Sequence, residues 1–331
     1  ASPNVVIDGR FDHEQVTTPA SRVIRTGVKP VFRVQTQEGY YVRATADHRI
    51  MTEYGWVEVQ NLKPGDRIHI VNRKGGFGAQ GSLEQGRVLG WAVGDGTVKK
   101  NQVVLSFFGD EKRELASMFA GYVNQLVEPL TTPSRTYPVG VTQVEARDEA
   151  RVSSTRLQAI IAEHGLNVIK HCVPEDVFQG SEDMQRGFLQ ALFTADGSFQ
   201  DGAAKGGSIR LAANRIELLE QVQMLLLNFG IASRIYRNRR DAGYRQMPDA
   251  QREPKAYWCE AQHELVISKR SMNVFADEIG FLMTYKQETL ENYLSRGSRG
   301  TYSDSFTARI QSVVADGVEE VFDLTEPLTH S

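Results

Sequence analysis

The 331-residue sequence contains only two cysteines, no apolar run long enough to cross a membrane and no strong excess of either charge. Cys172 and Cys259 form neither a Cys-x-x-Cys pair nor a cluster with histidine, which argues against a structural zinc site. The apolar runs fall short of the ~18–20 residues that a membrane span needs. No charged segment followed by an apolar core stands at the start, so we expect no secretory signal. These absences predict a cytoplasmic protein that makes no use of a membrane.

Basic residues are concentrated locally, although the formal net charge is −3. Between positions 234 and 252 the only carboxylates are Asp241 and Asp249. The same stretch contains the arginines Arg234, Arg237, Arg239, Arg240, Arg245 and Arg252. Such a cluster favours contact with phosphate even when the average charge does not. The alternative is a solvated loop.

Periodicity divides the chain into an outer β part and an inner mixed part. Alternating apolar and polar residues predict strands at 31–36 and 40–45, and the β pattern continues to about residue 71. Helical and strand patterns alternate from about residue 84 to a linker at 295–305, after which 308–324 echoes 21–34. We predict an α+β protein in which one all-β domain, residues 1–78 and 304–331, is interrupted by a second domain, residues 82–296.

The inner part contains a repeat. Val88–Gly96 and Leu189–Gly197 are both apolar runs that end in Asp-Gly and carry small residues four positions apart. Asp95 and Asp196 are 101 positions apart (196 − 95), about the length of a duplicated small domain. Because small residues allow helices to approach closely, the repeat predicts two helices side by side with both carboxylates at one end. For each aspartate alone, the alternative is a turn residue at a helix end.

The paired motifs resemble those of the LAGLIDADG homing endonucleases of the double-motif type, over nearly all of residues 84–294. The resemblance implies two pseudo-symmetric αββαββα halves, about 82–178 and 179–296. It also implies a monomer that makes a Mg²⁺-dependent double-strand break in a long DNA target. Asp95 and Asp196 would bind the metal, helped by the carbonyl groups of Gly94 and Ala195. The alternative is a DNA-binding module, or an inactive remnant, that does not cleave.

Further site residues are implied by the same resemblance. Lys170 lies shortly before a proline ahead of the second motif, and Lys286 is its partner in the internal repeat. Each would be a catalytic lysine near a scissile phosphate. Lys269 is the reserve candidate in the second half, and a surface lysine is the alternative for each position. Strand residues would contact double-stranded DNA, and those expected to do so are Gln102, Arg210, Arg237, Arg239 and Arg240.

The outer β parts resemble the Hint splicing domain of inteins. Thr45-Ala46-Asp47-His48 matches the Thr-x-x-His block of that family, and Val321–Thr325 followed by His330 matches a late block. The resemblance implies that Thr45, His48, Asp323 and His330 assist protein splicing between the two flanking host segments, the exteins. The first cysteine and the final His-Asn of the family are absent from the sequence as given, so we expect no splicing from it. Residues 323–331 are also similar to inteins in the large chains of ribonucleotide reductases.

Overall fold

The computed structural model describes residues 6–7, 10–11, 22–70, 75, 77–132, 137–145, 147–166, 171–202, 206–248, 254–296 and 306–325. Two expected site residues, Lys170 and His330, lie outside these ranges. Within them, no helix is both long enough and apolar enough to cross a membrane.

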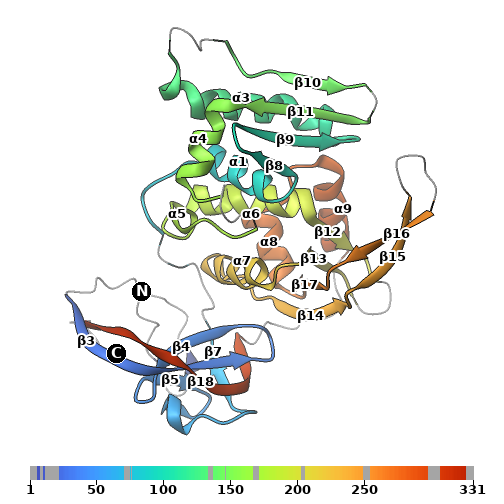
Figure 1. Ribbon diagram of the computed structural model, residues 1–331. Helices are drawn as coiled ribbons and strands as arrows, with labels where there is room; N and C mark the ends of the chain where they lie inside the picture. The colour runs from blue at the N-terminus through green and yellow to red at the C-terminus, as the bar shows by residue number, and fades with distance from the viewer. Residues whose placement is uncertain are drawn as a thin grey trace.

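The two ends of the described chain share one antiparallel sheet (Figure 1). Its six strands follow the order β4-β3-β18-β7-β5-β6. Their bounds are β3 (Arg22–Thr36), β4 (Tyr41–Thr45), β5 (Arg49–Thr52), β6 (Gly55–Glu58), β7 (Arg67–His69) and β18 (Thr307–Thr325). Pairing of β18 with β3 runs from Ile310↔Thr36 to Thr325↔Arg22, so the paired residues are 274 (310 − 36) to 303 (325 − 22) positions apart in the sequence. A short 3-10 helix, Val59–Asn61, joins β6 to the loop before β7, and β1 (Val6–Ile7) pairs separately with β2 (Arg10–Phe11).

Between these ends lies a unit in which one order of elements occurs twice. The first half comprises α1 (Leu83–Val93), β8 (Gly96–Lys99), β9 (Gln102–Phe108), α2 (Glu111–Glu114), α3 (Ala116–Val127), the 3-10 turn Glu128–Leu130, β10 (Val141–Val144), β11 (Glu149–Ser154) and α4 (Thr155–Glu163). A short helix, α5 (Glu175–Phe178), leads into the second half.

The second half repeats the order helix, two strands, helix, two strands, helix. In the described residues it adds the strand pair β15 and β16 and a final helix, and it has no counterpart of the short α2. It comprises α6 (Glu182–Asp196), β12 (Gly197–Gln200), β13 (Ser208–Ala213), α7 (Ile216–Asn228), β14 (Arg234–Arg240), β15 (Gly243–Pro248), β16 (Pro254–Cys259), β17 (Gln262–Ile267), α8 (Ser271–Glu278) and α9 (Thr284–Ser295). The sheets have matching orders, β10-β11-β9-β8 and β14-β17-β13-β12. The α+β prediction is therefore confirmed.

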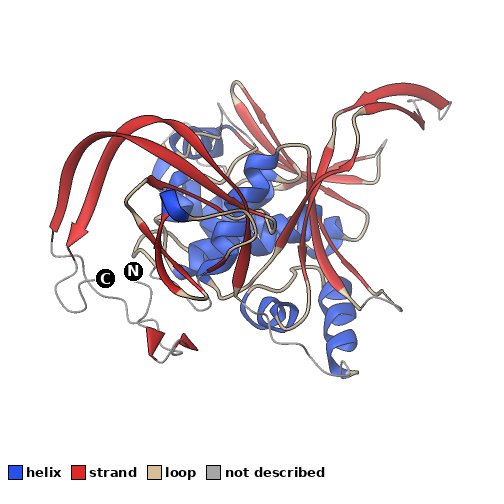
Figure 2. Ribbon diagram, turned by 90° about the horizontal axis from the view of Figure 1, so that it is seen from below, coloured by secondary structure: helices blue, strands red, loops and turns tan. Residues whose placement is uncertain are grey.

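One hydrophobic core serves both halves of this unit. The helices gather in the centre, and each four-stranded sheet packs one face against them (Figure 2). Alternation along β9 explains how: Val103, Leu105 and Phe107 are fully buried, whereas Gln102 and Ser106 lie on the other face and are only half-buried. Each sheet therefore keeps one open face directed away from the helices.

The six-stranded sheet has a much smaller core than the inner unit, and it packs against the second half of that unit. Its main cluster of buried apolar side chains, against which Leu227 of α7 packs, comprises Val34, Tyr40, Val59, Leu62, Ile68, Ala308 and Ile310. The β3–β4 turn docks between α7 and β14. Gly39 makes this possible, because its φ is +109° and a Cβ there would lie 2.9 Å from the Cβ of Ile235.

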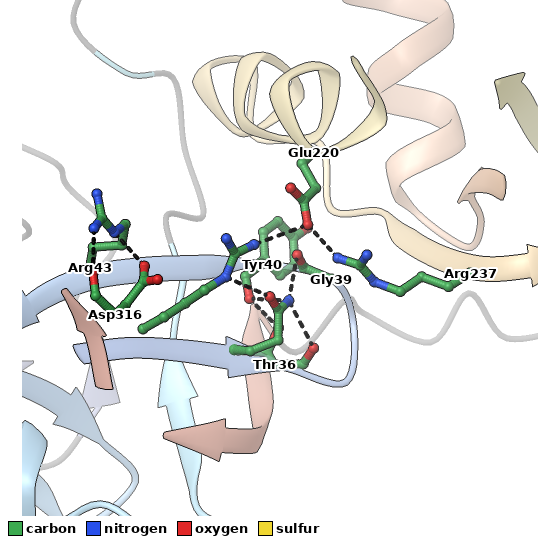
Figure 3. Close-up of polar contacts among 9 residues, drawn as sticks. Thr36, Gly39, Tyr40, Arg43, Glu220, Arg237 and Asp316 are labelled. Atoms are coloured by element: carbon green, nitrogen blue, oxygen red, sulfur yellow. Dashed lines mark hydrogen bonds and ion pairs between the residues drawn. The ribbon is translucent and has the colours of Figure 1, made fainter. Parts of the chain in front are cut away.

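Polar contacts complete this junction (Figure 3). The Tyr40 hydroxyl donates to the Ser233 carbonyl oxygen (3.1 Å) and accepts from its N–H (3.0 Å). The carboxylate of Glu220 on α7 pairs with Arg33 of β3 (3.2 Å) and with Arg237 of β14. The junction thus links the sheet to the strand that carries most of the expected DNA-binding arginines.

Candidate active site

Helices α1 and α6 pack against each other through glycines, at backbone contact. A Cβ on Gly90 would collide with the carbonyl oxygen of Phe188, one on Gly86 with that of Met184, and one on Gly187 with that of Leu83. Three positions in this seam therefore accept only glycine. The sequence repeat identified Gly90, whereas Gly86 and Gly187 were missed, although each lies four residues from a small residue already noted.

The seam brings the ends of the two motifs together. α1 ends at Gly94, where a Cβ would lie 2.8 Å from the Cβ of Ala195 and 3.3 Å from Oδ2 of Asp196. The second-half carboxylate is thus in contact with the residue directly before Asp95. Both aspartates also lie at the carboxyl-terminal ends of helices, where the helix dipole is negative and disfavours a carboxylate. A cation between them would offset that cost.

Lys286, in the first turn of α9, lies at this same place. Its ammonium group donates to the carbonyl oxygens of Thr194 (2.5 Å) and Gly197 (3.0 Å), the residues on either side of Ala195 and Asp196. Burial lowers the pKa of Lys286 from its ordinary value, and the negative charges of Glu111, Asp95 and Asp196 oppose that shift. The lysine expected from the repeat is therefore next to the paired aspartates.

Glu111 is a site residue that the sequence analysis missed. It begins α2, and its Oε2 accepts the Phe108 N–H (3.2 Å). Burial raises its pKa, as do the nearby charges of Asp95 and Asp196, while Lys286 lowers it. β9 runs antiparallel to β8, so the end of β9 lies beside the start of β8, which directly follows Asp95. That hairpin geometry is the signal that could have identified Glu111.

The donor set at the seam suits Mg²⁺ if substrate completes it. No group of three or more His, Cys, Asp and Glu side chains able to hold a metal occurs among the residues that the structure describes. Mg²⁺ usually takes only one or two carboxylates from the protein and fills its other positions with waters and phosphate oxygens. Two carboxylates from different halves, with main-chain carbonyl groups beside them, fit that preference.

The open face of the second sheet carries two of the expected DNA-binding arginines. Arg210 of β13 and Arg239 of β14 both pair with Glu264 of β17, at 3.1 Å and 3.4 Å. Gln102 lies on the corresponding face of the first sheet, and Arg240 is exposed at the end of β14. Arg237 differs, because its partner Glu220 belongs to α7, on the side of the sheet that faces the helices.

Comparison with known proteins gives one family match. Residues 183–280 match the LAGLIDADG-like domain. The match begins near the start of α6 and ends just after α8, so it contains Asp196 and the whole second sheet.

Curated relatives are longer proteins. The chain is 30% identical over 318 residues to the ribonucleoside-diphosphate reductase NrdEB subunit alpha of Bacillus subtilis (strain 168), which covers 91% of this chain and 29% of that protein. It is 26% identical over 376 residues to the replicative DNA helicase DnaB of Rhodothermus marinus, covering 94% of this chain and 40% of that one. The chain thus spans about three to four tenths of the length of these relatives. A solved structure of mesophilic variants of the homing endonuclease I-DmoI aligns with 63% of this chain and 97% of its own, at 19% identity and a TM-score of 0.40.

Of the described residues expected to assist splicing, Thr45 and His48 are neighbours, whereas Asp323 lies at another part of the six-stranded sheet. Thr45 ends β4 opposite Val31, and its hydroxyl hydrogen bond lowers the pKa of Asp47. His48 is exposed, and its carbonyl oxygen accepts the Val59 N–H (2.9 Å). Asp323 pairs with Ile24, seven positions before Val31 (31 − 24) on the same strand. At ~3.4 Å per residue, Asp323 and Thr45 are about 24 Å apart along β3.

Proposed function

We propose that residues 82–296 form a Mg²⁺-dependent homing endonuclease of the LAGLIDADG class, which makes a double-strand break in a long double-stranded DNA target. The observation that carries the proposal is the placement of Asp95 and Asp196, one from each half, at adjoining ends of the two glycine-packed helices. One chain supplies both carboxylates, so a monomer suffices. The open faces of the two sheets, with Gln102, Arg210, Arg239 and Arg240, would contact the DNA.

The chemistry follows from the charges at the seam. Bound Mg²⁺ would make water a better nucleophile and stabilise the leaving 3′-oxygen of the phosphodiester. Asp95 and Asp196 would hold it, beside the carbonyl groups of Gly94 and Ala195. Lys286, already held by two carbonyl oxygens next to Asp196, would place a positive charge beside the scissile phosphate. Lys170 is the corresponding proposal in the first half.

We further infer that the six-stranded sheet is the Hint domain of a protein-splicing element, residues 1–78 and 304–331, which this endonuclease interrupts. Pairing of β3 with β18 supports one domain built from both ends of the chain. Similarity over more than nine-tenths of this chain to parts of a reductase and of a helicase also supports it, because a mobile element is expected in unrelated hosts. Thr45, His48, Asp323 and His330 would assist splicing between the exteins. The element would act in the cytoplasm.

The test is digestion of linear DNA that contains the host gene with the coding sequence of this chain removed. We expect cleavage with Mg²⁺ and none with EDTA. Asp95→Asn and Asp196→Asn should each lower the rate of double-strand cleavage about 100-fold or more, because several kcal/mol of charge stabilisation is lost. DNA binding in a gel-shift assay should persist in both variants.

Asp183→Asn is the matched control, since Asp183 is exposed at the opposite end of α6. It should cleave like the wild type. Cleavage by Asp95→Asn or Asp196→Asn at the wild-type rate would refute the site. Binding of DNA by the wild type without cleavage would favour the second candidate, a DNA-binding module or an inactive remnant.

A further inference from the structure

The two halves differ most in their outer hairpins. In the first half, β10 and β11 pair over four positions, from Val141↔Val152 to Val144↔Glu149. In the second half, the equivalent pairing of β14 with β17 ends at Arg240↔Gln262, and the hairpin then continues as β15–β16. This added ribbon pairs over six positions, Gly243↔Cys259 to Pro248↔Pro254. It projects past the rest of the second sheet (Figures 1 and 2).

The ribbon exposes aromatic side chains that no core requires. Tyr244 is 74% exposed and Trp258 is 59% exposed, and their rings meet edge to face with centroids 5.3 Å apart. On the opposite face Arg245 is paired with Tyr257, and the Lys255 ammonium lies 5.9 Å from the centre of the Tyr257 ring. One face is thus aromatic, and the other combines two cations with an aromatic ring.

The charge of the ribbon and of the neighbouring β14 indicates what kind of partner the ribbon would bind. Over 234–248 and 254–262 the only described carboxylates are Asp241 and Glu260. Arg237 is turned toward Glu220 of α7, and Arg239 pairs with Glu264. The other basic residues of these segments are Arg234, Arg240, Arg245 and Lys255. Such a strip matches a phosphate backbone, and the major groove of B-DNA admits a two-stranded ribbon. The ribbon is also continuous with β14, which belongs to the sheet proposed to contact DNA.

We propose that β15–β16 binds the DNA duplex beyond the reach of the four-stranded sheet. Six paired positions at ~3.4 Å extend about 20 Å, which equals about six base pairs at ~3.4 Å each. The half-site bound by the second half is therefore longer than the other by about six base pairs. This inference rests on the proposed function, because it takes the open sheet faces as the DNA surface.

The test uses the duplex that is cut in the digestion experiment, trimmed stepwise from each end. Removing about six base pairs from one end only should weaken wild-type binding about tenfold, through the lost phosphate contacts. A variant in which an Asn-Gly turn replaces residues 243–259 should lose this dependence on the longer arm. Circular dichroism and cleavage of the trimmed duplex would check that the variant is folded.

A second experiment measures the phosphate contacts, through the salt dependence of DNA binding by substituted proteins. The slope of log K against log salt is negative, and each phosphate contact contributes about −0.9 to it. In the double variant Arg245→Ala/Lys255→Ala, the slope should therefore become less steep by about 2. Lys63→Ala, which removes an exposed cation from the six-stranded sheet unit, should leave the slope unchanged. Equal slopes and equal length dependence in all variants would overturn the proposal. A wild-type protein that binds no duplex overturns it together with the proposed function.

Discussion

At the scale of single residues, Glu149 controls the direction of an arginine on the open face of the first sheet. Its side chain is only 2% exposed, and its carboxylate accepts Arg151 Nε (2.6 Å), Arg151 Nη2 (3.0 Å) and Ser106 Oγ (3.0 Å). Hydrogen bonding from Arg151 is the main reason why its pKa lies below the ordinary value. Arg151 is thereby held in place on the surface proposed to meet DNA.

This pairing predicts a pH-dependent contribution to stability. A carboxyl with a lower pKa when folded stabilises the protein above its unfolded pKa of ~4.3 and loses that effect as the pH falls through the folded pKa. Glu149→Gln should therefore cost about 1 kcal/mol at pH 7, where solvent at Arg151 screens the pair. The cost should shrink below about pH 4. Urea unfolding at both pH values measures it, with exposed Glu145→Gln as the neutral control; a cost independent of pH would contradict the ionic interpretation.

At the scale of elements, the α1–α6 seam depends on glycine at Gly90. Gly90→Ala must separate the two helices, because its Cβ would collide with the Phe188 backbone. We expect a loss of stability of about 1–3 kcal/mol or more, together with slower cleavage as Asp95 and Asp196 move apart. Thermal unfolding and the cleavage assay measure the two effects.

Gly121→Ala is the matched control for this helix substitution. Gly121 lies inside α3 with no atom within 4 Å of a Cβ. There alanine should stabilise the protein by about 0.5–1 kcal/mol, the helix propensity difference. If both substitutions had the same effect, close packing of the seam would not be the reason for its glycines.

Helices and strands could be predicted from the sequence where the local pattern of apolar residues determines them. The Asp-Gly repeats gave the paired helices, and alternation gave the hairpin at 31–45, because periodicity reports which face each residue buries. Glu111 was missed because its place at the site depends on how β9 returns beside β8. Arg237 was assigned to the DNA surface from its charge, but its direction depends on Glu220, seventeen positions away in sequence (237 − 220). Such long-range pairings leave no local pattern.

At the scale of the whole molecule, the junction couples a small core to a large one. Among the described residues, the main apolar cluster of the six-stranded sheet has seven buried members, whereas one continuous core joins both halves of the other unit. A core of that size supplies little stability by itself. The sheet is therefore expected to depend on its contacts with α7 and β14, among them the Tyr40–Ser233 pair and the Glu38 carbonyl oxygen, which accepts the Ile235 N–H (2.9 Å).

Tyr40→Phe tests this dependence, because it removes the acceptor of the buried Ser233 N–H, whereas the Ser233 carbonyl oxygen keeps the Gln223 side-chain amide as a donor (3.2 Å). Such an unsatisfied group costs about 1–3 kcal/mol. In urea, we expect the fluorescence of Trp56, in the sheet, to change at a lower midpoint than in the wild type, while that of Trp91, beside the seam, shifts less. Single-tryptophan variants separate the two signals, and Tyr54→Phe, at a 91% exposed position, is the control. Equal shifts of both midpoints would instead mean that sheet and helices unfold as one unit, because a cooperative unit distributes a local loss over its whole structure.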